Sequence, residues 1–320
     1  MSAPNARLRV CHLLCFLGLL VLAALLTAPA SARADAPDQT FTVQGPDGVA
    51  IQAGVWLPDD AASGGERPLV VISHGNGGWY RGHHDTAEAL AHAGFIVAAL
   101  THSGDNFEDQ SRSTLLTARA PQLSALIDHM LAWQGPVRVD PARIGAFGFS
   151  AGGFTVTQAV GGQPEARAIP AYCAQHPDHF ACRLYAMQPV DPASWRPEAR
   201  DDRIRAAVIA APALGFAFTP DSLKSVTIPV QLWQAAEDEI LPSPFNVEPI
   251  RDGLGRTPDY HRVEGAMHFD FLTPCDARNR LPQPLCASSP GFDRAAFKAT
   301  FNRDVTRFFV ETLGAGAATR

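Results

Sequence analysis

A serine, an aspartate and a histidine, in that order along the chain, carry the chemistry that this sequence suggests. Ser150 is the centre of Gly-Phe-Ser-Ala-Gly at residues 148–152, between a short apolar run and a stretch of helical character. A strand–turn–helix of this kind exposes the serine hydroxyl, and it needs the flanking glycines because a Cβ there would clash. The motif alone is weak, since about one chain in ten of this length carries it by chance. Its value depends on the residues around it.

A serine hydroxyl becomes a nucleophile only when a base accepts its proton and an acid orients that base. His268 follows the last expected strand through a turn of small residues, whereas its weaker rival, His261, lies inside that strand. Asp238 comes just after another expected strand, where the catalytic groups of parallel sheets gather, and Glu237 is the fallback. The order Ser150, Asp238, His268 is typical of α/β-hydrolases and predicts a catalytic triad.

The glycine-rich segment 73–78, Ser-His-Gly-Asn-Gly-Gly, offers backbone donors for the negative charge that acyl transfer develops. We expect the N–H groups of Asn76 and Ala151 to form this oxyanion hole. A phosphate-binding loop is the competing interpretation, but no Gly-Lys-Ser/Thr follows and the next helix begins too late. We expect the substrate-binding pocket to be lined by four residues beside these motifs: His74, Gly75, His102 and Phe149.

The sequence predicts neither a cofactor nor a metal ion. His83 and His84 precede Asp85, but adjacent residues point apart on a helix. The chain has no Cys-x-x-Cys and no histidine pair at ligand spacing.

The expected elements place these residues at one edge of a mostly parallel sheet. Two alternating segments around residues 45–48 predict an antiparallel N-terminal hairpin. Apolar runs separated by amphipathic helices then predict an α/β fold with helices on both faces of the sheet. The expected strands after the hairpin are 68–73, 95–100, 143–149, 204–211, 228–234 and 260–263, and the clearest helices are 85–93, 121–133 and 297–308.

Residues 163–203 interrupt this alternation and predict a cap or insertion. Together with residues 105–118 and 275–286, they are expected to wall the pocket. No large apolar lid helix is evident, which favours short acyl chains.

Residues 1–34 predict a cleaved signal peptide. Arg7 and Arg9 precede an apolar run at 13–26 that is short for a membrane span, and Ala-Arg-Ala then offers a cleavage site, with Ala-Ser-Ala as second choice. An uncleaved anchor is the alternative. We expect a single domain at 35–320, periplasmic or secreted, without stable membrane insertion.

The net charge of −6, or −9 without the three arginines of the leader, is spread along the chain. It argues against nucleic acid or an anionic membrane as partner. The expected partner is a small-molecule ester.

Four cysteines follow the leader, and an even number in an exported protein implies disulfide bonds. Three pairings are possible. The local one joins Cys173 to Cys182 and Cys275 to Cys286, and it is favoured because each pair brackets one short loop. A metal site is the weaker alternative.

The ordered motifs resemble the bacterial family called predicted dienelactone hydrolases, exported α/β-hydrolases that are also similar to plasma-type platelet-activating-factor acetylhydrolases. The resemblance covers about residues 40–313, and its motifs lie at 72–78, 139–145, 148–153, 211–215 and 268–275. It implies the same triad and the same oxyanion donors.

Two departures from the family bear on the reaction. True dienelactone hydrolases use a cysteine nucleophile where this chain has Ser150, which argues against a lactonase. The family usually has histidine where this chain has Phe149, a change that leaves the triad intact. We therefore expect a serine esterase that forms an acyl-enzyme. A phospholipid deacylase, a peptidase of the same fold and a non-catalytic binding module are the alternatives.

Overall fold

The computed structural model describes residues 36–314, apart from 47, 277–278 and 280. The predicted signal peptide lies outside the described residues. Within them, the strands form an eight-stranded mixed sheet in the order β1-β2-β4-β3-β5-β6-β7-β8. The strands are β1 (Gln39–Gln44), β2 (Ala50–Trp56), β3 (Glu66–Ser73), β4 (Ile96–Leu100), β5 (Arg138–Phe149), β6 (Ile204–Ala210), β7 (Val230–Ala235) and β8 (Asp259–Val263).

The first two strands are antiparallel, and the rest of the sheet runs one way. β1 pairs with β2, and β2 with β4, in antiparallel register, whereas every pairing from β4 through β8 is parallel. This confirms the predicted antiparallel hairpin on a mostly parallel sheet. The carboxyl ends of β3 to β8 therefore meet at one edge, where a site built from several strand ends can form.

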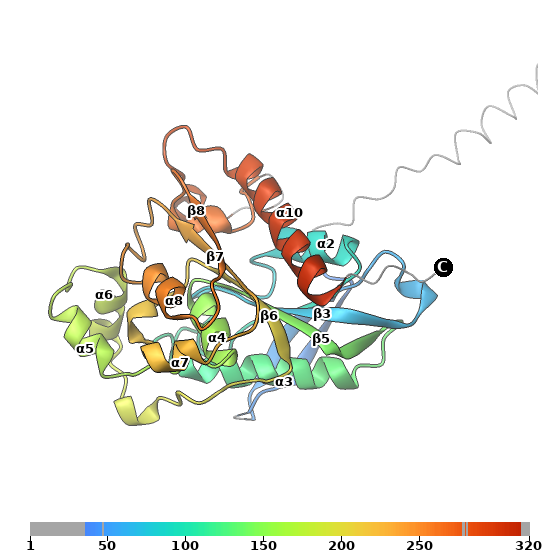
Figure 1. Ribbon diagram of the computed structural model, residues 1–320, viewed down its shortest axis with the longest axis horizontal. Coiled ribbons are helices and arrows are strands. Elements are labelled where there is room, and N and C mark those ends of the chain that lie inside the picture. The colour runs from blue at the N-terminus through green and yellow to red at the C-terminus, as the bar shows by residue number, and fades with distance from the viewer. Residues whose placement is uncertain (1–35, 47, 277–278, 280, 315–320) are drawn as a thin grey trace, which may run out of the picture. The chain divides into compact units, whose positions relative to one another are not determined.

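Helices cover both faces of the sheet, with α3 and α4 on one face and α2 and α10 on the other (Figure 1). The helices are α2 (His84–His92), α3 (Arg119–Ala132), α4 (Ala151–Ala159), α5 (Ala168–Cys173), α6 (Phe180–Met187), α7 (Pro220–Lys224), α8 (Val247–Gly253), α9 (Gln283–Cys286) and α10 (Arg294–Leu313). Short 3₁₀ turns lie at Ala61–Ser63, Leu116–Ala118, Pro192–Ser194, Gly215–Ala217 and His268–Phe271.

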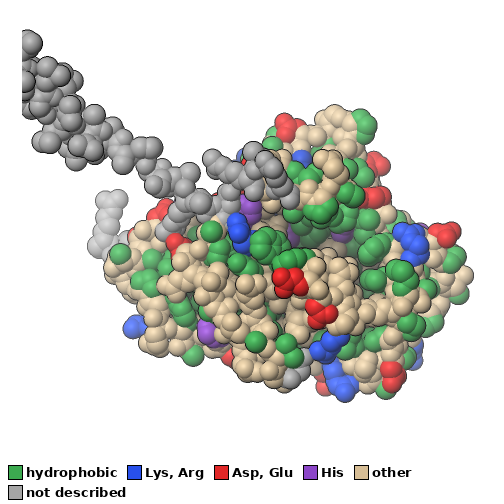
Figure 2. Space-filling model, turned by 180° about the vertical axis from the view of Figure 1, so that it is seen from behind, with side chains coloured by type: hydrophobic (Ala, Val, Ile, Leu, Met, Phe, Trp, Pro, Cys, Tyr) green, Lys and Arg blue, Asp and Glu red, His purple; other side chains and the backbone are tan. Residues whose placement is uncertain are grey.

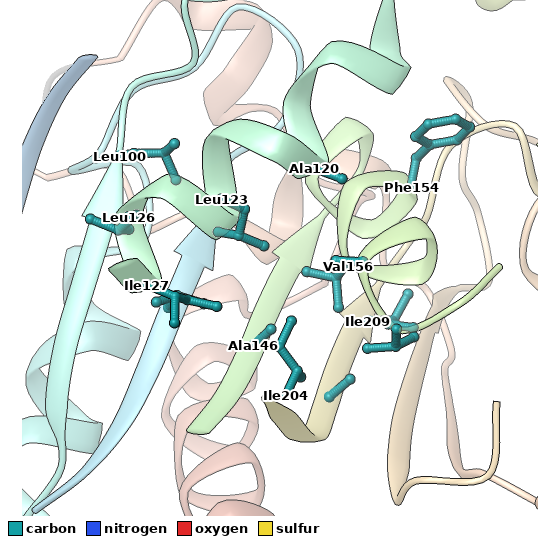
Figure 3. Packing of buried hydrophobic residues seen from close by; sticks show 14 of the residues in the cluster. Leu100, Ala120, Leu123, Leu126, Ile127, Ala146, Phe154, Val156, Ile204 and Ile209 are labelled. Carbon is teal, nitrogen blue, oxygen red and sulfur yellow. The ribbon is translucent and has the colours of Figure 1, made fainter. Parts of the chain in front are cut away.

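The central strands are apolar on both sides because each side meets a helical layer. In β3, Leu69 and Val71 pack in the core under α3 and α4, whereas Val70 and Ile72 pack in the core under α2 and α10. This alternation follows from the two-residue period of a strand. Figure 3 shows the first core, in which Leu123 of α3 lies over the sheet among the labelled side chains.

One strand and the insertion differ from the prediction. β5 begins at Arg138 rather than at residue 143, because residues 138–139 pair with the start of β3 before the register shifts. Pro141 falls in this irregular stretch, which is where a strand tolerates proline. The insertion at 163–203 is more ordered than its weak periodicity suggested, since it contains α5 and α6.

The surface of the described residues carries mixed charge. Acidic and basic side chains are interspersed on the face shown in Figure 2. No helix among the described residues combines the length and apolar character that crossing a membrane would require.

Candidate active site

Ser150 lies on the turn between β5 and α4. Its backbone has φ 57° and ψ −119°, and a positive φ is uncommon for a residue other than glycine. A Cβ on Gly148 would come within 2.1 Å of the Gly152 carbonyl oxygen, and one on Gly152 within 1.9 Å of the Ser73 carbonyl oxygen. Both glycines are therefore required by close backbone packing, and together they allow the strained turn that holds the serine at the strand end.

Ser150, His268 and Asp238 form one hydrogen-bonded chain. His268 Nε2 lies 3.0 Å from Ser150 Oγ, and His268 Nδ1 lies 2.8 Å from Asp238 Oδ2. The second carboxylate oxygen of Asp238 accepts the backbone N–H groups of Ile240 at 3.0 Å and Leu241 at 2.7 Å. The side chains of His268 and Asp238 are 1% and 5% exposed. The imidazole is thus placed to take the serine proton while a fixed, buried carboxylate orients the ring.

The two rival residues lie apart from this chain of hydrogen bonds. His261, on β8, stacks on Trp233 with ring centroids 4.1 Å apart and lies beside Asp259. Glu237 is exposed to solvent. The arrangement of base and acid therefore favours His268 and Asp238 over the alternatives that the sequence left open.

The backbone N–H groups of Asn76 and Ala151 are available beside Ser150. Within the described residues, neither donates a hydrogen bond to the protein, and Ala151 is the first residue of α4, where N–H groups have no intrahelical partner. Asp105 fixes the loop that carries Asn76, because its Oδ1 accepts Asn76 Nδ2 at 2.7 Å and the Gly77 N–H at 3.0 Å. These two donors can stabilise an oxyanion formed at Ser150.

Arg119 completes the support of this loop from the other side. Its guanidinium donates to the second oxygen of Asp105 and to the backbone carbonyl of His74. The hydrogen bond to His74 ties the segment before the oxyanion loop to α3. Arg119 and Asp105 are both buried, so solvent screens their charge pair little.

His102 does not line the pocket, which corrects the prediction from the sequence. Its side chain is fully buried. Its Nδ1–H donates to Gln122 Oε1 at 3.1 Å, and its Nε2 accepts from Ser73 Oγ at 2.8 Å. Burial, followed by the charge of Arg119, lowers the pKa of His102 well below its ordinary value. Both ring nitrogens serve the protein's own network, so neither is left for a substrate.

His74, Gly75 and Phe149 do lie along a cavity beside Ser150. The His74 Nδ1–H donates to the Gly75 carbonyl at 2.6 Å, and its Nε2 accepts the His102 N–H at 2.9 Å. His74 can therefore pack against a substrate, but neither of its ring nitrogens is left to form a hydrogen bond with one. The Phe149 ring lies 4.8 Å from the His268 ring and forms an apolar wall of the cavity.

Two cavities meet at Ser150, and Asn76 also lines both of them. The smaller has a volume of about 40 Å³ and apolar walls from α6 and from Leu116. The larger, about 310 Å³, extends past His268 to Leu285. The segments 163–203, 105–118 and 275–286, expected to wall the pocket, each contribute residues to these cavities.

The sequence reasoning missed Arg119, Asp105 and Gln122. A signal was present for Arg119, since it lies at helical spacing from Gln122, Leu123 and Leu126 on the buried face of α3. A charged residue on a mostly apolar stripe indicates a buried partner, because an unpaired charge is rarely buried. The partner itself could not be read from the sequence, since Asp105 lies in an irregular loop.

The cysteines pair locally in the structure. Cys173 is bonded to Cys182 between α5 and α6, and Cys275 is bonded to Cys286 at the end of α9. Across residues 36–314, the gaps excepted, no cluster of three or more His, Cys, Asp or Glu side chains could hold a metal ion.

Comparisons with known proteins support the fold. The family model described as "Prolyl oligopeptidase family" (Peptidase_S9) matches residues 83–185, which is less than half of the chain. Comparison with curated proteins yields no significant match.

Solved structures give broader but distant matches. A puromycin-hydrolyzing peptidase from Mycobacterium tuberculosis has a TM-score of 0.57 and 16% identity, over 90% of this chain and 41% of its own. A putative dipeptidyl aminopeptidase IV from Bacteroides ovatus has a TM-score of 0.53 and 14% identity, over 88% of this chain and 37% of its own. A ferulic acid esterase from Streptomyces cinnamoneus has a TM-score of 0.57 and 18% identity, over 90% of this chain and 92% of its own.

The chain thus spans about two fifths of the length of the two peptidases and most of the length of the esterase. At these identities the matches establish the fold alone, and the predicted α/β-hydrolase fold is confirmed. The resemblance to predicted dienelactone hydrolases stays a prediction.

Proposed function

We propose that this protein is a serine hydrolase that cleaves small, uncharged carboxylic esters with short acyl groups. The observation that carries the proposal is the hydrogen-bonded chain from Ser150 through His268 to Asp238, next to two available backbone N–H groups. A serine, a base, an orienting acid and oxyanion donors within reach of one another are the parts that acyl transfer needs.

The proposed reaction has two halves. Ser150 Oγ attacks the ester carbonyl while His268 Nε2 takes its proton, and the N–H groups of Asn76 and Ala151 hold the developing oxyanion. His268 then gives that proton to the departing alcohol, which leaves an acyl group on Ser150 Oγ. Water, deprotonated by the same imidazole, attacks the acyl-enzyme, and His268 returns that proton to Ser150 Oγ as the carboxylic acid leaves. Asp238 keeps the imidazole oriented and stabilises its protonated form throughout.

The lining of the two cavities favours an uncharged ester over a substrate with an ionised group near the scissile bond. Among the described residues that line them, none is Asp, Glu, Lys or Arg. A charge taken from water into such a site is costly unless a partner compensates it. The ferulic acid esterase, which is matched over 92% of its own chain, supports an ester as the substrate.

A peptidase is the second candidate, and the match of residues 83–185 to the prolyl oligopeptidase family model favours it. The same triad can cleave an amide, provided that the leaving amine is protonated by His268. The two candidates share every catalytic group and differ in the substrate that the cavities accept.

We further propose that the protein acts after export, in the periplasm or outside the cell. Two disulfide bonds support this, because such bonds persist in oxidising compartments.

Fluorophosphonate labelling of the mature protein and of Ser150→Ala, beside matched ester and amide substrates, tests the function. The panel is p-nitrophenyl acyl esters and aminoacyl p-nitroanilides, including prolyl ones. Labelling and ester turnover that both depend on Ser150 support the esterase, whereas faster anilide turnover replaces it with the peptidase. A folded wild-type protein that is not labelled overturns both proposals in favour of a non-catalytic binding module.

A further inference from the structure

Tyr185 stands between two apolar cavities. On one side it lines the small cavity of about 40 Å³ that contains Ser150 and Ala151. On the other side it lines a separate cavity of about 270 Å³ within the insertion, among Ile169, Pro189 and other mostly apolar residues of α5, α6 and the segment that follows. α6 therefore lies between the two cavities, and the Tyr185 side chain belongs to both walls.

Tyr185 is held in place by the segment opposite it. Its phenolic O–H donates to the Thr114 carbonyl at 2.8 Å. One turn of chain later, Gln188 Nε2 donates to the carbonyls of Gln110 at 3.0 Å and Ser111 at 2.7 Å. The end of α6 is thus joined by hydrogen bonds to residues 110–114, and these bonds favour the observed position of the ring.

The position of His268 decides which half of an ester enters which cavity. His268 must give its proton to the leaving alcohol, and it lines the cavity of about 310 Å³ but not the small one. The small cavity contains Ala151, whose N–H faces the carbonyl oxygen in the proposed reaction. The alcohol therefore belongs in the larger cavity, and the acyl chain in the small one.

The small cavity admits few atoms. Its volume is about 40 Å³, against about 310 Å³ for the cavity that contains His268. An acyl group placed there is therefore a short one. Leu116, Leu184 and Leu241 complete the apolar wall around Tyr185, so a polar acyl group would find little to bind.

We propose that Tyr185 sets the length of the acyl group that the enzyme accepts, and that the cavity behind it is a latent extension of the acyl site. The substrate class is then a short, apolar acyl ester of a bulkier alcohol. This inference rests on the proposed function, because it assumes that Ser150 forms an acyl-enzyme.

The test is the acyl-length profile of Tyr185→Ala on p-nitrophenyl esters from acetate to dodecanoate. Removal of the ring joins the two cavities, so kcat/KM for octanoate relative to acetate should rise by about tenfold or more, since each newly buried methylene is worth about fourfold in affinity. Tyr185→Leu, which keeps apolar bulk on α6, is the second opening variant. Tyr185→Phe keeps the ring and should keep the wild-type length limit.

Met187→Ala is the matched control, because this residue of α6 is 77% exposed and lines neither cavity. Fluorophosphonate labelling of Ser150 in each variant reports whether the catalytic centre is intact. Variants that are labelled but keep the wild-type length profile overturn the role of Tyr185 and leave the proposed function standing. Absence of labelling in the wild type overturns the proposed function itself.

Discussion

Asp105 and Arg119 form an ion pair in which each side chain is only 2% exposed, and the same aspartate holds the loop that carries Asn76. A pair buried this deeply gives little net stability by comparison with apolar packing, but breaking it leaves a charge without compensation. The pair therefore links the stability of the fold to the position of a proposed oxyanion donor.

Replacing Asp105 with alanine should damage both stability and rate. The buried Arg119 charge loses its partner, which should lower the free energy of unfolding by about 3–5 kcal/mol. The Asn76 N–H loses its support, so kcat should fall by about 10–100-fold with a smaller change in KM. Urea unfolding and steady-state kinetics measure the two effects.

Two further variants separate the effect of Asp105 on the position of the Asn76 loop from the effect of its charge on stability. Asp105→Asn keeps an acceptor oxygen for Asn76 and Gly77, so it should recover more of kcat than of stability. Glu165→Ala breaks an exposed pair with Arg167 and should change stability by less than about 1 kcal/mol. A wild-type kcat in folded Asp105→Ala would show that the loop holds its shape without the pair.

Asp238 and Glu237 are adjacent acids with different surroundings, and their amide variants should differ sharply. In Asp238→Asn the side chain no longer favours the required tautomer of His268, and kcat should fall by about 10⁴-fold. Glu237→Gln, at an exposed site, should stay within about twofold of the wild type. Comparable losses in both variants would contradict the assignment of Asp238 as the orienting acid.

The proximity of Ser150, Asp238 and His268 could be predicted from the sequence because each residue follows a strand, and parallel strands bring their carboxyl ends together. His102 also follows a strand, yet that prediction was wrong, since Ser73 and Gln122 take both of its ring nitrogens. A residue that follows a strand lies at the carboxyl edge of the sheet, but its place in the sequence does not determine where its side chain points. The direction depends on tertiary partners far along the chain, which no local pattern reveals.

The two cavities were beyond sequence reasoning for the same reason. Tyr185 lies on a helix that was not predicted, in an insertion with weak periodicity, and its contact with the Thr114 carbonyl joins segments 71 residues apart. The insertion could be recognised as a wall of the pocket, but the side chain that limits the pocket could not.

Three buried histidines, His74, His83 and His102, should make the fold sensitive to acid. Burial first, and then a nearby cation, lower the pKa of His83 to about 3 and those of the other two well below the ordinary value. Between pH 6.5 and these lowered pKa values, the unfolded chain binds protons that the native protein does not. The free energy of unfolding should therefore fall as pH falls, by about 1.4 kcal/mol per pH unit for each histidine.

His83→Phe tests this linkage. Neither ring nitrogen of His83 has a hydrogen-bond partner of normal geometry, and its ring packs edge-on against Phe147 and Phe149. The substitution therefore removes a titrating group with little loss of hydrogen bonding. Urea unfolding at pH 7, 6 and 5 should show a slope shallower than that of the wild type, by about 1 kcal/mol per pH unit on average over this range. An unchanged slope would mean that His83 is already protonated in the native protein.

The disulfide between Cys173 and Cys182 should influence substrate choice as well as stability. It closes a loop with a sequence separation of 9, so its loss in Cys173→Ser/Cys182→Ser should lower the free energy of unfolding by about 2.5–3 kcal/mol through chain entropy. Cys182 lies three residues before Tyr185 on α6. Loosening this helix should therefore broaden the range of acyl lengths accepted.

The second disulfide provides the matched comparison. It has a separation of 11, so Cys275→Ser/Cys286→Ser should cost about the same stability. Its neighbour Leu285 lines the cavity assigned to the alcohol, so this variant should alter preference among alcohols while it keeps the acyl-length limit. Unfolding curves, an acyl series with one alcohol and an alcohol series with one acyl group distinguish the effects. If both variants shifted the same series, the division of the ester between the two cavities would be wrong.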